Sequence, residues 1–141
     1  MKYVFVYGTL RPGQKYHHLI EKFVEKTIPA FVKGRLYHLR EGYPALLLER
    51  DLSSSVEIVP VRGDLLGFTE LDPVLPILDE LEDYFGPRDP RNMYERVTTL
   101  AITSDQSAIS STVYVFSGEK LDWLERNAVP IPTGDWVLGN S

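Results

Sequence analysis

The 141 residues suffice for a single domain over positions 1–141, and a content of 43% hydrophobic and 25% charged residues is ordinary for a globular protein. The net charge of −5 argues against a nucleic-acid or anionic-membrane partner, and the lack of cysteine excludes disulfides and thiol nucleophiles. We find no signal peptide pattern and no apolar run near the ~20 residues of a membrane helix. A cytoplasmic protein that is a monomer or weak homodimer is therefore expected.

The first half of the chain predicts strands with one helix among them. Residues 2–7 are rich in Val, Phe and Tyr, which indicates a buried strand that ends at Gly8. Apolar residues then recur at helical spacing, which predicts an amphipathic helix over residues 15–25. Further strands are predicted at residues 31–39, 45–48 and 56–68, the last with a bulge or bend at Gly63.

The second half contains the clearest helix. Asp72 is suited to the N-cap and Pro73 to the first helical position, and the apolar stripe that follows consists of Val74, Ile77, Leu78 and Leu81. The helix should stop near residues 84–86, before a proline-rich loop. Strands at residues 94–103 and 111–116 are expected to form a hairpin, followed by a helical turn or two at residues 120–126. This content favours an α+β fold with a mostly antiparallel or mixed sheet, curled into a barrel.

The end of the first strand, "YGTLRPGQ", is a candidate binding loop. A strand followed by Gly8, Thr9 and Leu10 can leave successive backbone N–H groups free to bind an anion, and Gly8 lets the backbone approach a ligand closely. The alternative is a plain turn in which Thr9 satisfies local backbone groups. The histidines have no metal-ligand spacing and the serines form no nucleophile elbow, so neither a metal site nor a serine nucleophile is expected.

One carboxylate of the helix stands out. Asp79 and Asp83 lie opposite the apolar stripe and are expected to be solvated, whereas Glu82 lies on its flank in the last turn. Partial burial and the helix dipole would both raise the pKa of Glu82, which suits a general base, although a surface glutamate at a helix end is the alternative. Tyr94 and Arg96 share one strand face, and an inward face would require a carboxylate or a ligand as their partner.

Five motifs occur in order along the chain: "YGTLRPGQ", "GYPAL", "LDELEDY", "MYERV" and "TGDW". Together they resemble the gamma-glutamylcyclotransferase-like family, above all its short members of the gamma-glutamylaminecyclotransferase and AIG2-like type, over residues 2–136. The resemblance implies a small mixed, mostly antiparallel β-barrel with two or three flanking helices. It also implies an enzyme without a cofactor that releases 5-oxoproline from a γ-glutamyl amine or dipeptide, by attack of the α-amine on the γ-carbonyl.

The resemblance assigns Glu82 as the general acid and base. The substrate-binding residues that it implies are Tyr7, Gly8, Thr9, Leu10, Arg11, Gly42, Tyr43, Pro44, Tyr94 and Tyr114, with the N–H groups of residues 7–10 on the α-carboxylate. Many relatives have Gly directly after the glutamate, whereas this chain has Asp83. We therefore expect a slightly longer helix and, if Asp83 is close, a further rise in the pKa of Glu82.

Alternatives to this enzyme remain open. A non-catalytic protein could bind a small carboxylated metabolite on the same fold, and hydrolysis or transfer of another acyl substrate is a further alternative. The loop over residues 85–92 carries Arg88 and Arg91, and it is expected to be either a rim that selects the leaving amine or a solvated connector.

Overall fold

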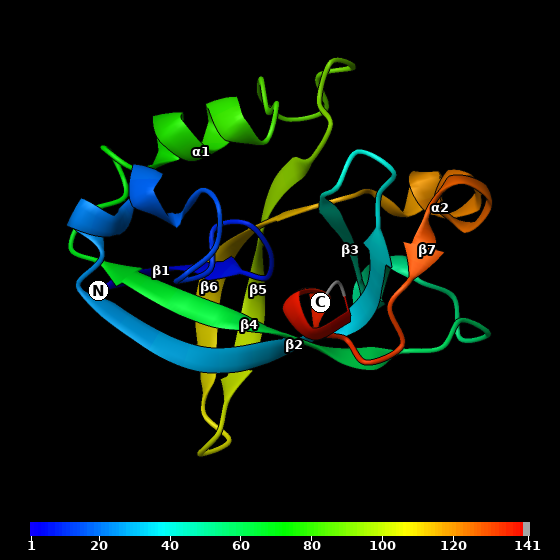
Figure 1. The fold of residues 1–141 in the computed structure, drawn as a ribbon, viewed down its shortest axis with the longest axis horizontal. Coiled ribbons are helices and arrows are strands. Elements are labelled where there is room, and N and C mark those ends of the chain that lie inside the picture. The colour runs from blue at the N-terminus through cyan, green and yellow to red at the C-terminus, as the bar shows by residue number, and fades with distance from the viewer. Residues whose placement is uncertain (140–141) are drawn as a thin grey trace.

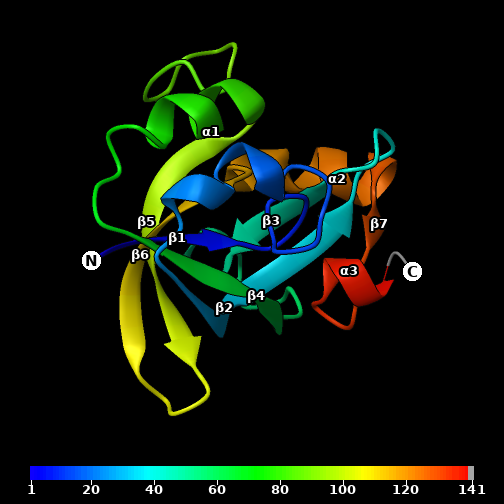
Figure 2. The ribbon, with the colours of Figure 1, turned by 60° about the vertical axis from the view of Figure 1, so that its left-hand side comes forward.

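A computed structural model describes residues 1–139, and its centre is a closed barrel of five strands (Figures 1 and 2). The order around the barrel is β2 (Lys26–His38), β4 (Val59–Phe68), β1 (Lys2–Val6), β6 (Ala108–Val115) and β5 (Glu95–Thr103). Pairing of β5 with β2 closes the ring. β1 and β6 run parallel and the other barrel pairs are antiparallel. The predicted small, mixed, mostly antiparallel barrel is thereby confirmed.

Strand β2 is the longest and reaches beyond the barrel. Its first part pairs with β4, and its last part pairs with β3 (Pro44–Leu48) and β7 (Val129–Pro130). It begins at Lys26, earlier than predicted, because the residues around Pro29 pair with β4 although proline interrupts the strand pattern. The register through Gly63 is continuous, so the predicted bulge is wrong; a Cβ there would lie 2.2 Å from the Val6 carbonyl oxygen, and glycine allows β1 to come close.

Helix α1 (Leu75–Leu81) begins later than predicted. The N-cap is Val74 and not Asp72, because a turn comes first in which the N–H groups of residues 74 and 75 both donate to the Leu71 carbonyl. The apolar stripe is confirmed, with Val74 and Leu78 fully buried and the other two members packed against them. Both views show α1 lying across one side of the barrel (Figures 1 and 2).

The predicted helix over residues 15–25 is wrong. Two short 3-10 turns occupy this segment, η1 (His17–Leu19) and η2 (Glu21–Phe23). Hydrogen bonds tie the segment to the barrel at both ends, from the Tyr16 N–H to the Thr9 carbonyl and from the Glu25 N–H to the Gly67 carbonyl, both 2.8 Å. The apolar residues of this segment still contribute to the core, because Ile20 between the two turns is completely buried.

The remaining segments follow the predictions more closely. β5 and β6 form the expected hairpin, and the expected helical turns are η4 (Gly118–Lys120) and α2 (Leu121–Asn127). Two further short elements are η3 (Glu49–Asp51) and α3 (Trp136–Gly139). Within residues 1–139, no helix has the length and apolar character that a membrane span requires.

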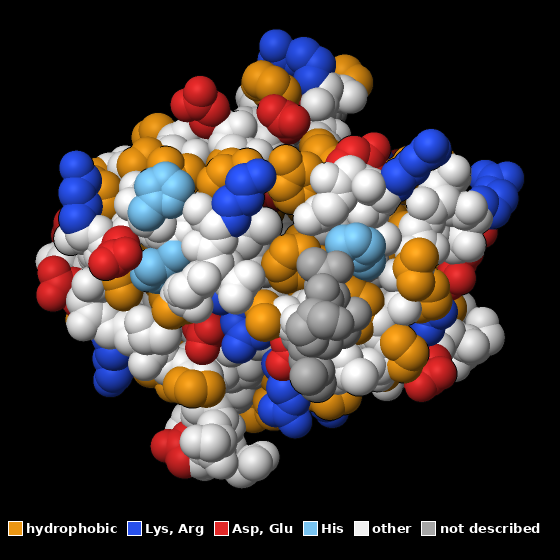
Figure 3. Space-filling model, viewed as in Figure 1, with side chains coloured by type: hydrophobic (Ala, Val, Ile, Leu, Met, Phe, Trp, Pro, Cys, Tyr) orange, Lys and Arg blue, Asp and Glu red, His pale blue; other side chains and the backbone are white. Residues whose placement is uncertain are grey.

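Two clusters of buried side chains make up the core. One draws on residues of several strands, such as Phe5, Leu65 and Val113. The other joins Val4 and the alternate residues of β1 to the apolar stripe of α1. Because successive strand residues point to opposite sides, β1 contributes to both clusters, and its end is therefore held firmly. Acidic and basic side chains alternate across the described surface visible in Figure 3.

Candidate active site

A cavity of about 130 Å³ lies where the end of β1, the end of α1 and the start of β3 meet. All of the site residues predicted from the sequence line it, except Arg11 and Gly42. The lining residues that were predicted are Tyr7, Gly8, Thr9, Leu10, Tyr43, Pro44, Glu82, Tyr94 and Tyr114. Residues from four of the five motifs therefore line this cavity, whereas no residue of the "TGDW" motif does.

The residues after β1 form a tight turn that opens toward this cavity. The Arg11 N–H donates to the Gly8 carbonyl at 3.1 Å and closes the turn. The N–H groups of Gly8, Thr9 and Leu10 donate to no acceptor among residues 1–139. We call residues 8–11 the cradle turn. Successive unpaired amides of this kind form a concave site for an anion.

Gly8 also has a packing role that the sequence did not indicate. A Cβ at this position would lie 2.4 Å from Cγ of Pro44, closer than any real side chain tolerates. The glycine therefore lets the cradle turn pack against the proline at the start of β3. Contact between the turn and Pro44 brings the first and third strands together at the cavity.

Glu82 is the C-cap residue of α1, directly after Leu81, and its side chain lines the cavity. Burial first, and then the neighbouring Asp83 carboxylate, together raise its pKa from 4.5 to about 8. The expected effects of burial and of Asp83 on this pKa are both confirmed. A carboxyl group with such a pKa can both accept and return a proton near neutral pH.

Asp83 does not lengthen the helix, contrary to the prediction. Its φ of 51° is left-handed, so the helix stops and the chain turns away immediately after Glu82. Glycine adopts this conformation most easily, and Asp is among the few other residues that tolerate it. Asp83 therefore keeps the backbone path that a glycine would give, while adding a carboxylate at the cavity.

Two tyrosine hydroxyls brace the cavity walls. Tyr7 Oη donates to the Tyr114 carbonyl and Tyr94 Oη donates to the Pro44 carbonyl, both at 2.6 Å. Burial first, and nearby negative charge including that of Glu82, raise the pKa of both phenols well above their ordinary value. Both therefore stay neutral, and since each hydroxyl hydrogen is used, each oxygen can only accept from a ligand.

Asp79 was expected to be solvated, and this expectation is wrong. Its carboxylate accepts hydrogen bonds from Arg96 Nη1 at 2.6 and 2.8 Å and from Tyr114 Oη at 2.6 Å. The Arg96 guanidinium also lies 4.9 Å from the centre of the Tyr84 ring. The carboxylate partner foreseen for Arg96 thus comes from α1, and it fastens that helix to β5 and β6. Asp79 precedes Glu82 by three residues, a spacing that places both on one helical side and could have revealed the role.

The two predicted site residues outside the cavity have structural contacts instead. Arg11 Nε lies 2.8 Å from Asp64 Oδ2, and its Nη1 lies 3.3 Å from Asp135 Oδ1. Gly42 has a φ of 94° in the turn between β2 and β3, a conformation that favours glycine. That turn delivers Tyr43 to the cavity.

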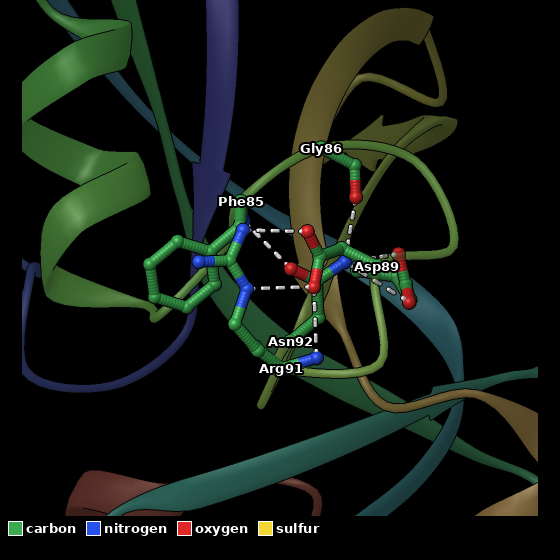
Figure 4. Close-up of polar contacts among 6 residues, drawn as sticks. Phe85, Gly86, Asp89, Arg91 and Asn92 are labelled. Carbon is green, nitrogen blue, oxygen red and sulfur yellow. Dashed lines mark hydrogen bonds and ion pairs between the residues drawn. The ribbon is translucent and has the colours of Figure 1, made fainter.

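Most polar contacts of the loop over residues 85–92 lie within the loop, apart from a contact of Asn92 with Glu95, and no residue of the loop lines the cavity (Figure 4). Asn92 is its centre, because its Oδ1 accepts from the Phe85 N–H at 2.6 Å and its Nδ2 donates to the Gly86 carbonyl at 2.7 Å. Arg91 pairs with Asp89 at 2.8 Å and lies 4.3 Å from the centre of the Phe85 ring. The cavity lining stops at residue 83 and resumes at residue 93, so the connector alternative is favoured over the rim.

Comparison with known proteins agrees with this geometry. Residues 4–138 match the model of the family described as gamma-glutamyl cyclotransferase, AIG2-like. The chain belongs to this family. A gamma-L-glutamyl-butirosin B gamma-glutamyl cyclotransferase from Niallia circulans is 35% identical over 125 residues, which cover 89% of this chain and 72% of that protein.

Solved structures share the fold. YkqA from Bacillus subtilis aligns with a TM-score of 0.61 at 24% identity over 96% of this chain, and this chain spans 39% of YkqA. An AIG2-like protein from Mus musculus aligns with a TM-score of 0.56 at 22% identity, over 88% of this chain and 82% of that one. This AIG2-like chain therefore shares its overall fold with both proteins.

Sequence reasoning missed several lining residues of this AIG2-like cyclotransferase family member. Tyr16 reaches the cavity from the segment predicted as a helix, and Met93 precedes Tyr94 where the chain returns from the loop. Leu81 contributes from the apolar stripe of α1. Met93 and Leu81 carried a signal, since they belong to the "MYERV" and "LDELEDY" motifs, but Leu81 and Tyr16 had already been assigned to helical packing.

Proposed function

We propose that this protein is a γ-glutamyl cyclotransferase that releases 5-oxoproline from a γ-glutamyl amine or dipeptide, with Glu82 as general acid and base. A single observation carries the proposal: the unpaired amides of the cradle turn and the carboxyl group of Glu82 line the same small cavity. The amides of the cradle turn can bind an anion, and the carboxyl group of Glu82 can exchange a proton with an amine. A γ-glutamyl group carries both a carboxylate and an amine on its α-carbon.

The substrate's α-carboxylate is assigned to the cradle turn. The N–H groups of this turn supply hydrogen bonds to an anion, although no Lys, Arg or His is among the lining residues. The α-amine is assigned to the acceptors opposite, which are Glu82 and the hydroxyl oxygens of Tyr7 and Tyr94. An amine held between these groups is oriented toward the γ-carbonyl carbon of the same molecule.

The reaction then requires one proton carrier. Glu82 takes a proton from the α-amine as its nitrogen attacks the γ-carbonyl carbon and forms the five-membered ring. The same carboxyl returns the proton to the leaving amine as the old C–N bond breaks, so the reaction starts from the ionised form of Glu82 and regenerates it. Holding the two reacting ends of one molecule in contact can supply several of the about 7–11 kcal/mol that favourable orientation makes available.

The decisive experiment is a substrate panel. Purified protein is incubated with γ-glutamyl dipeptides and γ-glutamyl amines, and 5-oxoproline and the released amine are quantified by mass spectrometry against heat-inactivated protein. Equal amounts of both products are expected from at least one substrate. Release of glutamate in place of 5-oxoproline would instead indicate hydrolysis. Tight binding of 5-oxoproline without any turnover would support a non-catalytic binding protein.

A further inference from the structure

We propose that Arg11 is a positioning residue, which fixes the cradle turn so that the free amides of Thr9 and Leu10 converge on the substrate's α-carboxylate. The proposal rests on the function proposed above. It replaces the direct substrate contact expected for Arg11, because its side chain lies outside the cavity lining.

The contacts of Arg11 are shielded from solvent. The side chain is 19% exposed, and its partners Asp64 and Asp135 are 13% and 21% exposed. Nε donates to Asp64 and Nη1 to Asp135, so the planar guanidinium spans two carboxylates with separate nitrogens. Shielded, charge-assisted contacts of this kind hold a side chain more firmly than exposed ion pairs do.

Both anchors lead back to strand β4. Asp64 belongs to β4 and pairs with Val6, at the end of the strand that delivers the cradle turn. Asp135 follows Gly134, whose carbonyl accepts from the Arg62 N–H of β4 at 2.7 Å. The arginine side chain thus connects the turn to the barrel wall directly and through the segment near the C-terminal end of the described chain.

The backbone of the same residue completes the turn. The Arg11 N–H closes it onto the Gly8 carbonyl, and the Arg11 carbonyl accepts from the Gln14 N–H at 2.9 Å. The contacts of the Arg11 side chain therefore fix the directions in which the N–H groups of Thr9 and Leu10 point. Arg11 also places a positive charge beside the turn, which favours the approach of a carboxylate.

The experiment compares two substrates that differ only in the α-carboxylate. One is the γ-glutamyl amine that the panel identifies as best, and the other is the 4-aminobutanoyl amide of the same leaving amine, which can still close a lactam ring. The wild type is expected to prefer the first. In Arg11→Gln this preference, as a ratio of kcat/KM values, should fall roughly 10- to 100-fold, the range for losing a hydrogen bond to a charged group. In Arg11→Lys the same ratio should fall less.

Arg91→Gln is the matched control, because Arg91 also pairs with an aspartate but lies in the self-contained loop. Its preference should equal that of the wild type. If Arg11→Gln slows both substrates equally and leaves the ratio unchanged, the arginine supports only the fold and the proposal is wrong. Should Arg11→Gln fail to fold, Asp64→Asn and Asp135→Asn provide the same comparison, each with a smaller expected fall and the same contrary outcome.

A binding experiment distinguishes a failure of this proposal from a failure of the proposed function. Dissociation constants for 5-oxoproline and 2-pyrrolidinone, which lacks the carboxylate, are measured by calorimetry for the wild type and Arg11→Gln. A loss of preference for 5-oxoproline in the variant supports the positioning role even if no substrate turns over. Turnover by the wild type together with an unchanged binding preference in the variant would leave the function standing and remove the role of Arg11.

Discussion

The cradle turn and the loop over residues 85–92 look alike in sequence, since each follows a regular element and combines glycine with arginine. The first was expected to bind the substrate, and the second to be either a rim of the site or a solvated connector. The structure separates them. The arginine of the cradle turn reaches a strand of the barrel and a segment far along the chain, with Arg11 and Asp135 lying 124 residues apart. Arg91 of the loop pairs with Asp89, two residues away.

The difference shows what a polar loop needs in order to present its backbone to a ligand. In the cradle turn, side-chain contacts to the barrel hold the backbone while its amides stay unpaired. In the loop, the side chain of Asn92 satisfies backbone groups of Phe85 and Gly86 directly. A loop whose polar groups bond to one another has few left for a ligand, whatever its composition.

The largest expected effect concerns Glu82, which lies between α1 and the loop over residues 85–92. Glu82→Gln keeps the shape of the side chain but cannot carry a proton, so kcat should fall by about 10²- to 10⁴-fold, the usual contribution of a general base. The protein should still fold and bind 5-oxoproline. Steady-state kinetics and calorimetry measure both properties. Glu80→Gln, an exposed glutamate of the same helix, is the control and should stay near wild type.

The same variant has a signature in stability. The folded protein holds the Glu82 proton up to about pH 8, whereas the unfolded chain releases it near 4.5. Between these values the folded state binds more protons, so the free energy of unfolding should fall as pH rises from about 4.5 to 8. Denaturation of wild type and Glu82→Gln across this range tests the idea, and parallel curves would show that Glu82 titrates normally.

A second comparison sets the ion pair of Asp79 against that of Asp89. Asp79→Asn weakens the half-buried contact with Arg96, whose side chain is 31% exposed, and should lower the free energy of unfolding by about 1–2 kcal/mol. Asp89→Asn weakens an exposed pair and should change it little. Urea denaturation decides between them. Equal losses would mean that the fastening of α1 to the barrel adds no more than the local pair in the loop.

A smaller effect is expected at Asp83. Its carboxylate raises the pKa of Glu82, so Asp83→Asn should lower that pKa while keeping a side chain that tolerates the left-handed conformation. Carbon-detected NMR titration of the Glu82 carboxyl group measures the midpoint. Asp89→Asn should leave the midpoint where it is in the wild type. An unchanged midpoint in Asp83→Asn would assign the whole shift to burial.

The smallest expected effect is in the loop itself. Replacing Arg88 and Arg91 with alanine should leave the ratio of kcat/KM values for a γ-glutamyl dipeptide and a γ-glutamyl amine unchanged, because no residue from 85 to 92 lines the cavity. Parallel kinetics with both substrates measure the ratio. A change in the ratio, with stability preserved, would show that the loop does select the leaving amine, and the two segments would then not differ in this respect.

The sequence allowed most of the barrel to be predicted, but fewer of the details around it. Alternation along residues 2–7 and the apolar stripe of α1 follow from local periodicity, which records which side of an element is buried. The 3-10 turns of residues 17–23 escaped prediction because apolar spacing alone does not distinguish them from a helix. Helix ends depend on local competition for single carbonyls, as at Leu71, and periodicity carries no information about that.

By itself the sequence determined that a strand ends in a glycine-containing turn, that a glutamate lies on the flank of a helix, and that the motifs resemble one family. The tertiary structure decided that these two features meet at one cavity, and that Asp79, Arg11 and Asp135 bond to partners across the fold. The physical reason is distance along the chain. A residue's face within its element depends on neighbours a few positions away, whereas its polar partner depends on how the barrel closes.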